Sequence, residues 1–196
     1  MMKITIYTDG SSRGNPGRGG WGAVILVDRQ QTTDNRGYNA EDEVIELGGR
    51  EDHTTNNRME LMGAIEGLRH VGSSSFFVRE EPGSERPTDN DQRLTSIEIC
   101  TDSQYVKKGM TEWIDGWIAK GWKGSTKKPV LNKELWQDLK KEEDRLKKGG
   151  VKVTWKYVPA HVGVVMNERA DTIATMCADN DSDLELYRGP KSGYTF

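Results

Sequence analysis

Two segments of the chain share one pattern, in which a short run of alternating apolar residues leads into an aspartate. Ile4 and Ile6 lie five and three residues before Asp9, and a second isoleucine pair has the same spacing before Asp102. Alternation of this kind predicts β-strands, in which successive side chains point to opposite faces. Each aspartate therefore faces away from its isoleucine pair. Neighbouring parallel strands in matching phase would present both carboxylates on one side of the sheet.

The periodicity of the whole chain predicts an α/β domain with three strands, a helix, a fourth strand, further helices, a fifth strand and a closing helix. The expected strands cover residues 3–8, 21–27, 43–47, 97–101 and 151–158. The expected helices begin near Arg58, Ser103, Thr111, Lys133 and Glu168. Asn56 or Asn57 can cap the first of these helices, and Asn132 can cap the fourth. Residues 28–42 and 73–95 break the patterns and are expected to be loops.

Acidic residues stand in four distinctive settings, in a fixed order along the chain. The four segments are Thr8-Asp9-Gly10-Ser11, Asn56-Asn57-Arg58-Met59-Glu60-Leu61, Thr101-Asp102-Ser103-Gln104-Tyr105 and Asn167-Glu168-Arg169-Ala170-Asp171. With His161 ten residues before the last member, this ordered set resembles ribonuclease H of the bacterial type, class I (the ribonuclease HI family). The resemblance covers roughly residues 1–70 and 97–178.

The resemblance implies a ribonuclease H-like α/β fold, with a mixed five-stranded sheet in the order 3-2-1-4-5 flanked by helices. Strands 1, 4 and 5 would be parallel, and right-handed crossovers would place the carboxyl ends of strands 1 and 4 side by side. We expect residues 1–178 to form the catalytic domain, with residues 73–95 as a loop insertion and residues 179–196 as a C-terminal tail.

The implied activity is hydrolysis of the RNA strand of RNA–DNA hybrids, which leaves 5′-phosphate and 3′-hydroxyl ends. The implied metal ligands are Asp9, Glu60, Asp102 and Asp171, with Asp9 bridging two ions. Four carboxylates at one point need cations, because like charges raise one another's pKa values. Oxygen ligands select hard ions, so two Mg²⁺ ions are expected, with Mn²⁺ as a substitute. His161, whose reference pKa suits proton transfer, is implied to assist proton transfer or product release.

The resemblance also implies which residues contact the hybrid. The matching positions are Gly10, Asn15, Thr55, Asn56, Asn57 and Gln104. Most of them would read the minor groove, where an enzyme senses the 2′-hydroxyl through backbone contacts, and Thr55 would belong to a phosphate pocket for the DNA strand. One position departs from the family. Gly116 stands where many members have an asparagine, just before the second tryptophan of this segment.

Basic residues concentrate in one part of a chain whose formal net charge is −3. Residues 107–156 hold fourteen Lys or Arg and seven Asp or Glu. Residues 107–133 resemble the basic protrusion, or handle, of many family members, and its phosphate contacts would come from Lys120, Lys123, Lys127 and Lys128. We expect Trp113 and Trp117 to pack at the base of the helices rather than stack on nucleotides.

Two other functional classes stay open at this stage. A DNA-cleaving relative of the same fold, such as a transposase or a junction resolvase, would lack the Asn-Asn-Arg-Met-Glu and Thr-Asp-Ser-Gln segments. A catalytically silent hybrid-binding module would not need the intact acidic set. The chain has no apolar run of about 18 residues and no secretory leader pattern. We therefore expect a cytoplasmic protein without membrane contact, and we expect a monomer.

Overall fold

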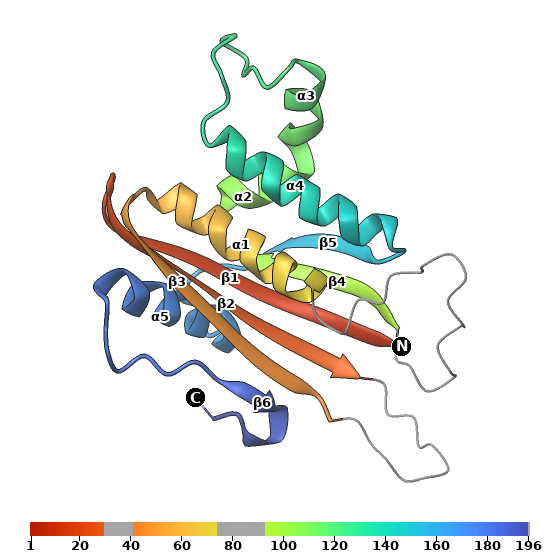
Figure 1. Ribbon diagram of the computed structural model, residues 1–196, viewed down its shortest axis with the longest axis vertical. Helices are drawn as coiled ribbons and strands as arrows, with labels where there is room; N and C mark the ends of the chain where they lie inside the picture. Colours follow the sequence, from red (N-terminus) through yellow and green to blue (C-terminus); the bar gives the residue numbers. More distant parts are fainter. Residues whose placement is uncertain (30–40, 74–92, 196) are drawn as a thin grey trace.

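A six-stranded mixed sheet forms the centre of the protein, and the computed structural model describes residues 1–29, 41–73 and 93–195 (Figure 1). The strands are β1 (Met2–Gly14), β2 (Gly17–Arg29), β3 (Glu43–Thr54), β4 (Leu94–Thr101), β5 (Lys152–Tyr157) and β6 (Arg188–Pro190). They lie in the order β5-β4-β1-β2-β3-β6. β4 is parallel to both β1 and β5, and the other neighbours are antiparallel. The predicted order of the first five strands is confirmed.

The sixth strand corrects the expected count of five. β6 comes from the tail beyond residue 178. It pairs with β3, so that Val44 lies beside Gly189 and one further residue pair lies on either side. A three-residue strand that contains Gly and Pro shows no alternation, so its sequence does not predict a strand. β3 is also longer than predicted. Gly48 and Gly49 interrupt its apolar alternation but stay paired with β2.

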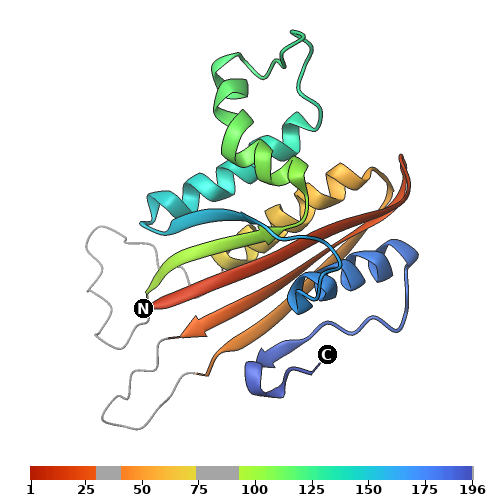
Figure 2. The ribbon, with the colours of Figure 1, turned by 180° about the vertical axis from the view of Figure 1, so that it is seen from behind.

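Helices cover both faces of the sheet. α1 (Asn56–Ser73) packs on the face where Ile6 points, and α5 (Val165–Asp179) packs on the opposite face (Figures 1 and 2). α4 (Lys133–Lys148) lies against α1 and β5. Between β4 and α4 come α2 (Gln104–Lys108), the π-helical turn η1 (Gly109–Trp113) and α3 (Ile114–Ala119), and a short 3₁₀ turn, η2 (Lys191–Gly193), follows β6.

The matching phase of the two isoleucine-bearing strands is confirmed. β1 and β4 pair Ile4 with Ile97, and their register ends with Thr8 beside Thr101. The isoleucines are fully buried against α1 and its neighbours. Burial of one such side chain contributes roughly 1.5–3 kcal/mol relative to leaving it exposed. Packing of the core therefore fixes the register of β1 and β4, and this register places Asp9 level with Asp102.

Two helices start earlier than expected, and the capping of a third differs in detail. α1 begins at Asn56, so the residue that precedes it is Thr55, whose carbonyl accepts the N–H groups of Arg58 and Met59. Asn132 occupies the N-cap position of α4, as predicted, but it adopts a left-handed conformation (φ 57°). Its side chain makes no capping hydrogen bond, and its amide donates to the Tyr105 hydroxyl. α5 begins at Val165, three residues before the predicted start. The predicted inward face of α4 is confirmed, since its leucines and Trp136 are buried.

The protrusion is anchored by a cluster of aromatic rings. The ring centroids of Trp117 and Trp136 lie 5.3 Å apart, and those of Trp113 and Trp117 lie 5.7 Å apart. This confirms that the two tryptophans pack at the base of the helices. Gly109 permits the contact, because a Cβ there would lie 1.9 Å from a ring atom of Trp136.

Both predicted loops lie largely outside the described residues. β2 ends at Arg29 and β3 begins at Glu43, so most of the loop at residues 28–42 is not described. The insertion at residues 73–95 is described only at its two ends, where α1 stops at Ser73 and β4 starts at Leu94. In the described ranges 1–29, 41–73 and 93–195, no helix combines the length and apolar character of a membrane span.

Candidate active site

Three carboxylates converge beside the point where β4 ends. Asp102 directly follows β4, Asp9 lies level with it in β1, and Glu60 reaches them from the second turn of α1. One carboxylate oxygen from each residue lies within 4.8 Å of the other two. The side chains of Asp9 and Glu60 are buried, with 6% and 7% of their residue surface exposed. The site therefore gathers three acidic groups from three elements that are far apart in the sequence.

Gly10 lets α1 approach β1 this closely. A Cβ at Gly10 would lie 2.2 Å from the main-chain nitrogen of Glu60, which is far inside van der Waals contact. Any side chain at this position would push the start of α1 away from the strand. The structure thus gives Gly10 a packing role beside Asp9, and its expected contact with the substrate stays a prediction.

Neighbouring polar groups hold each carboxylate. Asp9 accepts the main-chain N–H of Gly10 at 2.7 Å. Glu60 accepts the side-chain amide of Asn56 at 3.2 Å through Oε1, while its buried Oε2 has no hydrogen-bond partner among the described residues. Asp102 accepts the amide of Asn167 at 3.0 Å. The free oxygen of Glu60 is therefore available to a cation.

The electrostatics of the cluster disfavour three negative charges. The pKa of Asp9 is raised to about 8, first by burial and then by the neighbouring charge of Asp102. Burial, followed by the charges of Asp9 and Asp102, raises the pKa of Glu60 well above its ordinary value. A bound cation would oppose both shifts, because it stabilises the charged form of each carboxylate.

Asp171 acts on the cluster from α5, whereas His161 lies in an exposed loop. Asp171 is a half-buried residue of α5 whose charge and side-chain hydrogen bond bear on Asp9, although it is not part of the 4.8 Å group. His161 is exposed in the loop between β5 and α5, with a left-handed φ of 53°. It forms no hydrogen bond or ion pair within the part of the chain that is described. The structure brings three carboxylates together, sets Asp171 beside Asp9, and leaves His161 at the surface.

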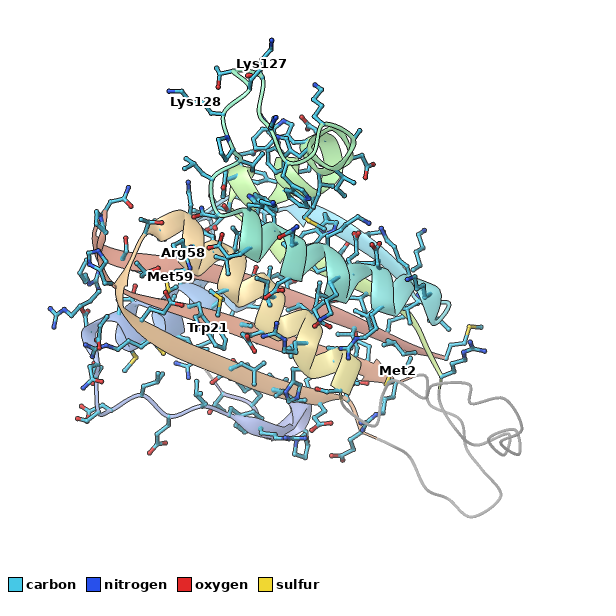
Figure 3. All side chains as sticks on the ribbon, turned by 45° about the horizontal axis from the view of Figure 1, so that its top comes forward. Met2, Trp21, Arg58, Met59, Lys127 and Lys128 are labelled. Carbon is cyan, nitrogen blue, oxygen red and sulfur yellow. The ribbon has the colours of Figure 1, made fainter. Side chains whose placement is uncertain are left out.

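The expected substrate contacts occupy exposed turns and helix starts. Asn15 lies in the turn between β1 and β2, Thr55 joins β3 to α1, Asn56 and Asn57 open α1, and Gln104 opens α2. The four handle lysines are exposed in the segment after α3, and Lys127 and Lys128 project from the tip of the protrusion, away from the sheet (Figure 3). These side chains are placed where a large ligand could reach them.

Sequence reasoning missed one residue of the site. Asn167 is 2% exposed, donates to Asp102, and leaves its own Oδ1 without a partner among the described residues. It stands first in the Asn-Glu-Arg-Ala-Asp segment, yet only the last residue of that segment was assigned a role. The signal that could have found it is a polar residue at an otherwise buried helix position.

Comparison with known proteins gives the family. The ribonuclease H family model matches residues 1–179. The chain belongs to the ribonuclease H family. Ribonuclease H of Chromohalobacter salexigens is 40% identical over 179 residues, which cover 91% of this chain and 86% of that protein. Ribonuclease H of Erythrobacter litoralis is 40% identical over 182 residues, which cover 93% of this chain and 100% of that protein.

Solved structures of ribonucleases H share the fold. LC9-RNase H1, described as a type 1 RNase H with the type 2 active-site motif, is 27% identical with a TM-score of 0.67, over 95% of this chain and 77% of that one. LC11-RNase H1, solved in complex with an RNA/DNA hybrid, is 20% identical with a TM-score of 0.52, over 90% of this chain and 97% of that one. The predicted family and fold of this ribonuclease H are confirmed.

Proposed function

We propose that the protein is an endonuclease that hydrolyses the RNA strand of RNA–DNA hybrids with two divalent metal ions, Mg²⁺ first and Mn²⁺ as a substitute. The observation that carries the proposal is the convergence of Asp9, Glu60 and Asp102 to within 4.8 Å, in a chain that belongs to the ribonuclease H family. The products would carry 5′-phosphate and 3′-hydroxyl ends.

The residues of the site fit hard divalent cations. The cluster offers only carboxylate oxygens, which Mg²⁺ and Mn²⁺ prefer over softer metals. The buried Glu60 Oε2 has no hydrogen-bond partner among the described residues, and burial and mutual repulsion raise the pKa values of Asp9 and Glu60. Asp171 would complete the set from α5, where its charge already acts on Asp9.

The chain itself would orient the groups for an in-line displacement. Asn56 and Asn167 fix the carboxylates of Glu60 and Asp102 through side-chain hydrogen bonds, so that the ligand oxygens are held before the substrate binds. Bound divalent ions would lower the pKa of the attacking water and stabilise the charge on the leaving oxygen. His161, exposed in its loop, would carry a proton to or from the reacting oxygens.

Substrate binding would use the exposed polar turns and the handle. Gly10, Asn15, Asn56, Asn57 and Gln104 would contact the minor groove, and Thr55 a phosphate of the DNA strand, where sequence-independent backbone contacts suffice. Lys120, Lys123, Lys127 and Lys128 would neutralise further phosphates. The hybrid bound to LC11-RNase H1, a protein of the same fold, supports this class of substrate.

One assay separates this function from its alternatives. Hybrid, duplex DNA and duplex RNA are incubated with the protein and Mg²⁺, and the labelled strands are resolved on a gel. We expect cleavage of the RNA strand of the hybrid alone. Cleavage of duplex DNA would identify a DNA-cleaving relative instead, and binding of the hybrid without cleavage would identify a silent module.

We also propose that residues 1–178 form the catalytic domain of a cytoplasmic monomer, to which the tail adds β6. Two observations support the monomer: β6 covers the edge of β3, and the opposite edge strand, β5, carries the exposed Lys152 and Lys156, which discourage edge-to-edge pairing. Cys100 and Cys177 are both free thiols, as is usual in a reducing compartment. The oligomeric state is checked by light scattering of the purified protein.

A further inference from the structure

The tail lies beyond the residues that the ribonuclease H family model matches, which end at 179. It nevertheless packs closely on the domain. It runs back along α5 to reach β3 (Figures 1 and 2). Beside β6, the main chain of Tyr187 accepts the N–H of Glu46 at 2.8 Å, and the rings of Tyr187 and Tyr194 pack with centroids 5.0 Å apart. The tail is therefore joined to the sheet by main-chain and aromatic contacts.

Glu46 is the residue on which β3, α5 and the tail meet. Its side chain is completely buried, yet both carboxylate oxygens are used. Arg169 of α5 donates to them from Nε at 2.7 Å and from Nη2 at 2.8 Å. The tail adds the main-chain N–H of Tyr187 at 2.9 Å and the hydroxyl of Tyr194. We call Glu46, Arg169, Tyr187 and Tyr194 the Glu46 cluster.

The surface beneath α5 explains why such a cluster matters. A Cβ at Gly20 would lie 2.3 Å from the carbonyl oxygen of Ala174, and one at Gly22 would lie 2.3 Å from that of Ala170. The helix thus rests on bare backbone of β2. Contact this close buries area but offers few interlocking side chains, which normally fix how a helix is placed along its partner. The ion pair between Arg169 and Glu46 supplies a fixed point.

Two residues of α5 bear on the carboxylate cluster. Asn167 donates to Asp102 at 3.0 Å, and Asp171 acts on Asp9 through its charge and a hydrogen bond. Arg169 lies between them in the sequence. A small shift of α5 would therefore move both residues, and a misplacement of about 1 Å can cost about a hundredfold in rate.

We propose that tail residues 184–195 are a positioning element of the active site, which acts through the Glu46 cluster to hold Asn167 and Asp171 of α5 against Asp102 and Asp9. The inference rests on the proposed metal-dependent function of these carboxylates. In this proposal the four residues of the cluster have no contact with the substrate. They act through α5, so their effect appears in metal affinity and turnover rather than in hybrid affinity.

The test uses point variants of the full chain. Tyr194→Phe keeps the ring and removes one hydrogen bond to Glu46. Glu46→Gln removes the charge at nearly constant volume. If Glu46→Gln alone fails to fold because the half-buried Arg169 is left without its counter-charge, the pair Glu46→Gln with Arg169→Gln replaces it. Lys191→Gln is the matched control, because Lys191 joins the tail to Asp28 and Asp42 without touching Glu46.

Each variant is characterised well below its melting temperature by calorimetric titration with Mn²⁺ and by steady-state cleavage of the hybrid. We expect Tyr194→Phe to weaken Mn²⁺ binding and lower kcat by about three- to tenfold, the range for one hydrogen bond, with KM unchanged. The Glu46 variant should show a larger loss, and Lys191→Gln none. Melting temperatures that fall while Mn²⁺ affinity and kcat stay at wild-type values would overturn the proposal, and so would an equal loss in Lys191→Gln.

The two readouts separate this inference from the proposed function. A wild-type protein that binds Mn²⁺ but does not cleave the hybrid would contradict the proposed function. The Mn²⁺ affinities of the variants would still decide whether the tail positions α5.

Discussion

Asp102 lies beside Asp9 at the point where β4 ends next to the parallel strand β1, and its charge acts on the buried carboxyl group of Asp9. Burial and then the charge of Asp102 raise the pKa of Asp9 to about 8. A carboxyl group with a raised pKa contributes its stability at low pH, below its unfolded pKa of about 4, and that contribution is lost as pH rises through the folded value. The metal-free protein should therefore lose stability between about pH 4 and pH 8.

Asp9→Asn tests this relationship and the metal site together. The variant keeps the volume and removes the charge, so it should abolish Mg²⁺-dependent cleavage while the fold persists. Without metal it should be more stable than the wild type at pH 8 by at least about 1 kcal/mol, and the difference should vanish near pH 4. Urea unfolding across this pH range measures it. Asp138→Asn, at an exposed site on α4, is the control. Near wild-type activity in folded Asp9→Asn would refute the assignment of Asp9.

His161→Ala tests the exposed loop histidine. We expect turnover to slow by about 10- to 100-fold, because a helper in proton transfer contributes at or below the low end of the usual acid–base range. Hybrid affinity should barely change, which a binding titration in Ca²⁺ would show. His53→Ala changes another exposed histidine and should be neutral. Complete loss of activity would mean that His161 has a structural or ligand role, and no loss would make it a bystander.

The handle is tested through its charge. Changing Lys120, Lys123, Lys127 and Lys128 to Gln should raise KM and leave the chemical step unchanged. The log–log salt dependence of hybrid binding should flatten by somewhat under one unit for each phosphate contact that is lost. The control variant changes four other exposed lysines, Lys3, Lys141, Lys148 and Lys152. An unaltered slope in the handle variant, or the same change in both, would show that the handle does not bind phosphates.

Gly116 offers a test by gain of function. A Cβ at this exposed position of α3 would meet nothing within 4 Å, so a side chain fits without strain. Gly116→Asn should lower KM by about two- to tenfold if its amide reaches a DNA-strand phosphate, as one hydrogen bond permits. Gly116→Ala raises helix stability by about 0.5–1 kcal/mol without the amide and should leave KM unchanged. Equal KM values in all three proteins would exclude a phosphate contact at this position.

The insertion should be dispensable for cleavage. Its described ends lie far from the carboxylates, since Ser73 is the last residue of α1 and Leu94 pairs with Met2 at the start of β1. Replacing residues 79–92 with a short Gly/Ser turn should keep hybrid cleavage within a few-fold, because loop-closure entropy depends weakly on length. The replacement spares Arg93, whose carbonyl accepts the N–H of Met2. Aggregation, or a loss beyond about tenfold in a folded protein, would indicate that the insertion covers a surface or binds a partner.

Local patterns predicted the elements that depend on local periodicity. The isoleucine phase placed Asp9 beside Asp102, and the apolar spacing of α4 gave its buried face. Non-local contacts could not be read in this way. Glu46 stands in an alternating strand, where a polar residue normally faces solvent, and its partner Arg169 is 123 residues away. Only the fold shows that this glutamate is buried.

Tertiary hydrogen bonds explain the remaining differences. Asn132 stands at the N-cap position of α4, but its side chain donates to the Tyr105 hydroxyl and makes no hydrogen bond to the helix. Asn167 begins the buried face of α5, and its hydrogen-bond partner Asp102 belongs to a different part of the chain. In both cases the side chain bonds a residue that is distant in the sequence, so local patterns could not predict the hydrogen bond.

The contact between Gly109 and Trp136 means that substitutions in the protrusion and substitutions in the sheet have different effects. The protrusion joins the rest of the protein through this helix–helix contact, whereas the placement of Asp9 and Asp102 depends on strand register. Substitutions beyond Gly109 can alter the exposed lysines of the protrusion without disturbing the alignment of Asp9 and Asp102. The surface of the protrusion can therefore change while the geometry of these two carboxylates stays the same.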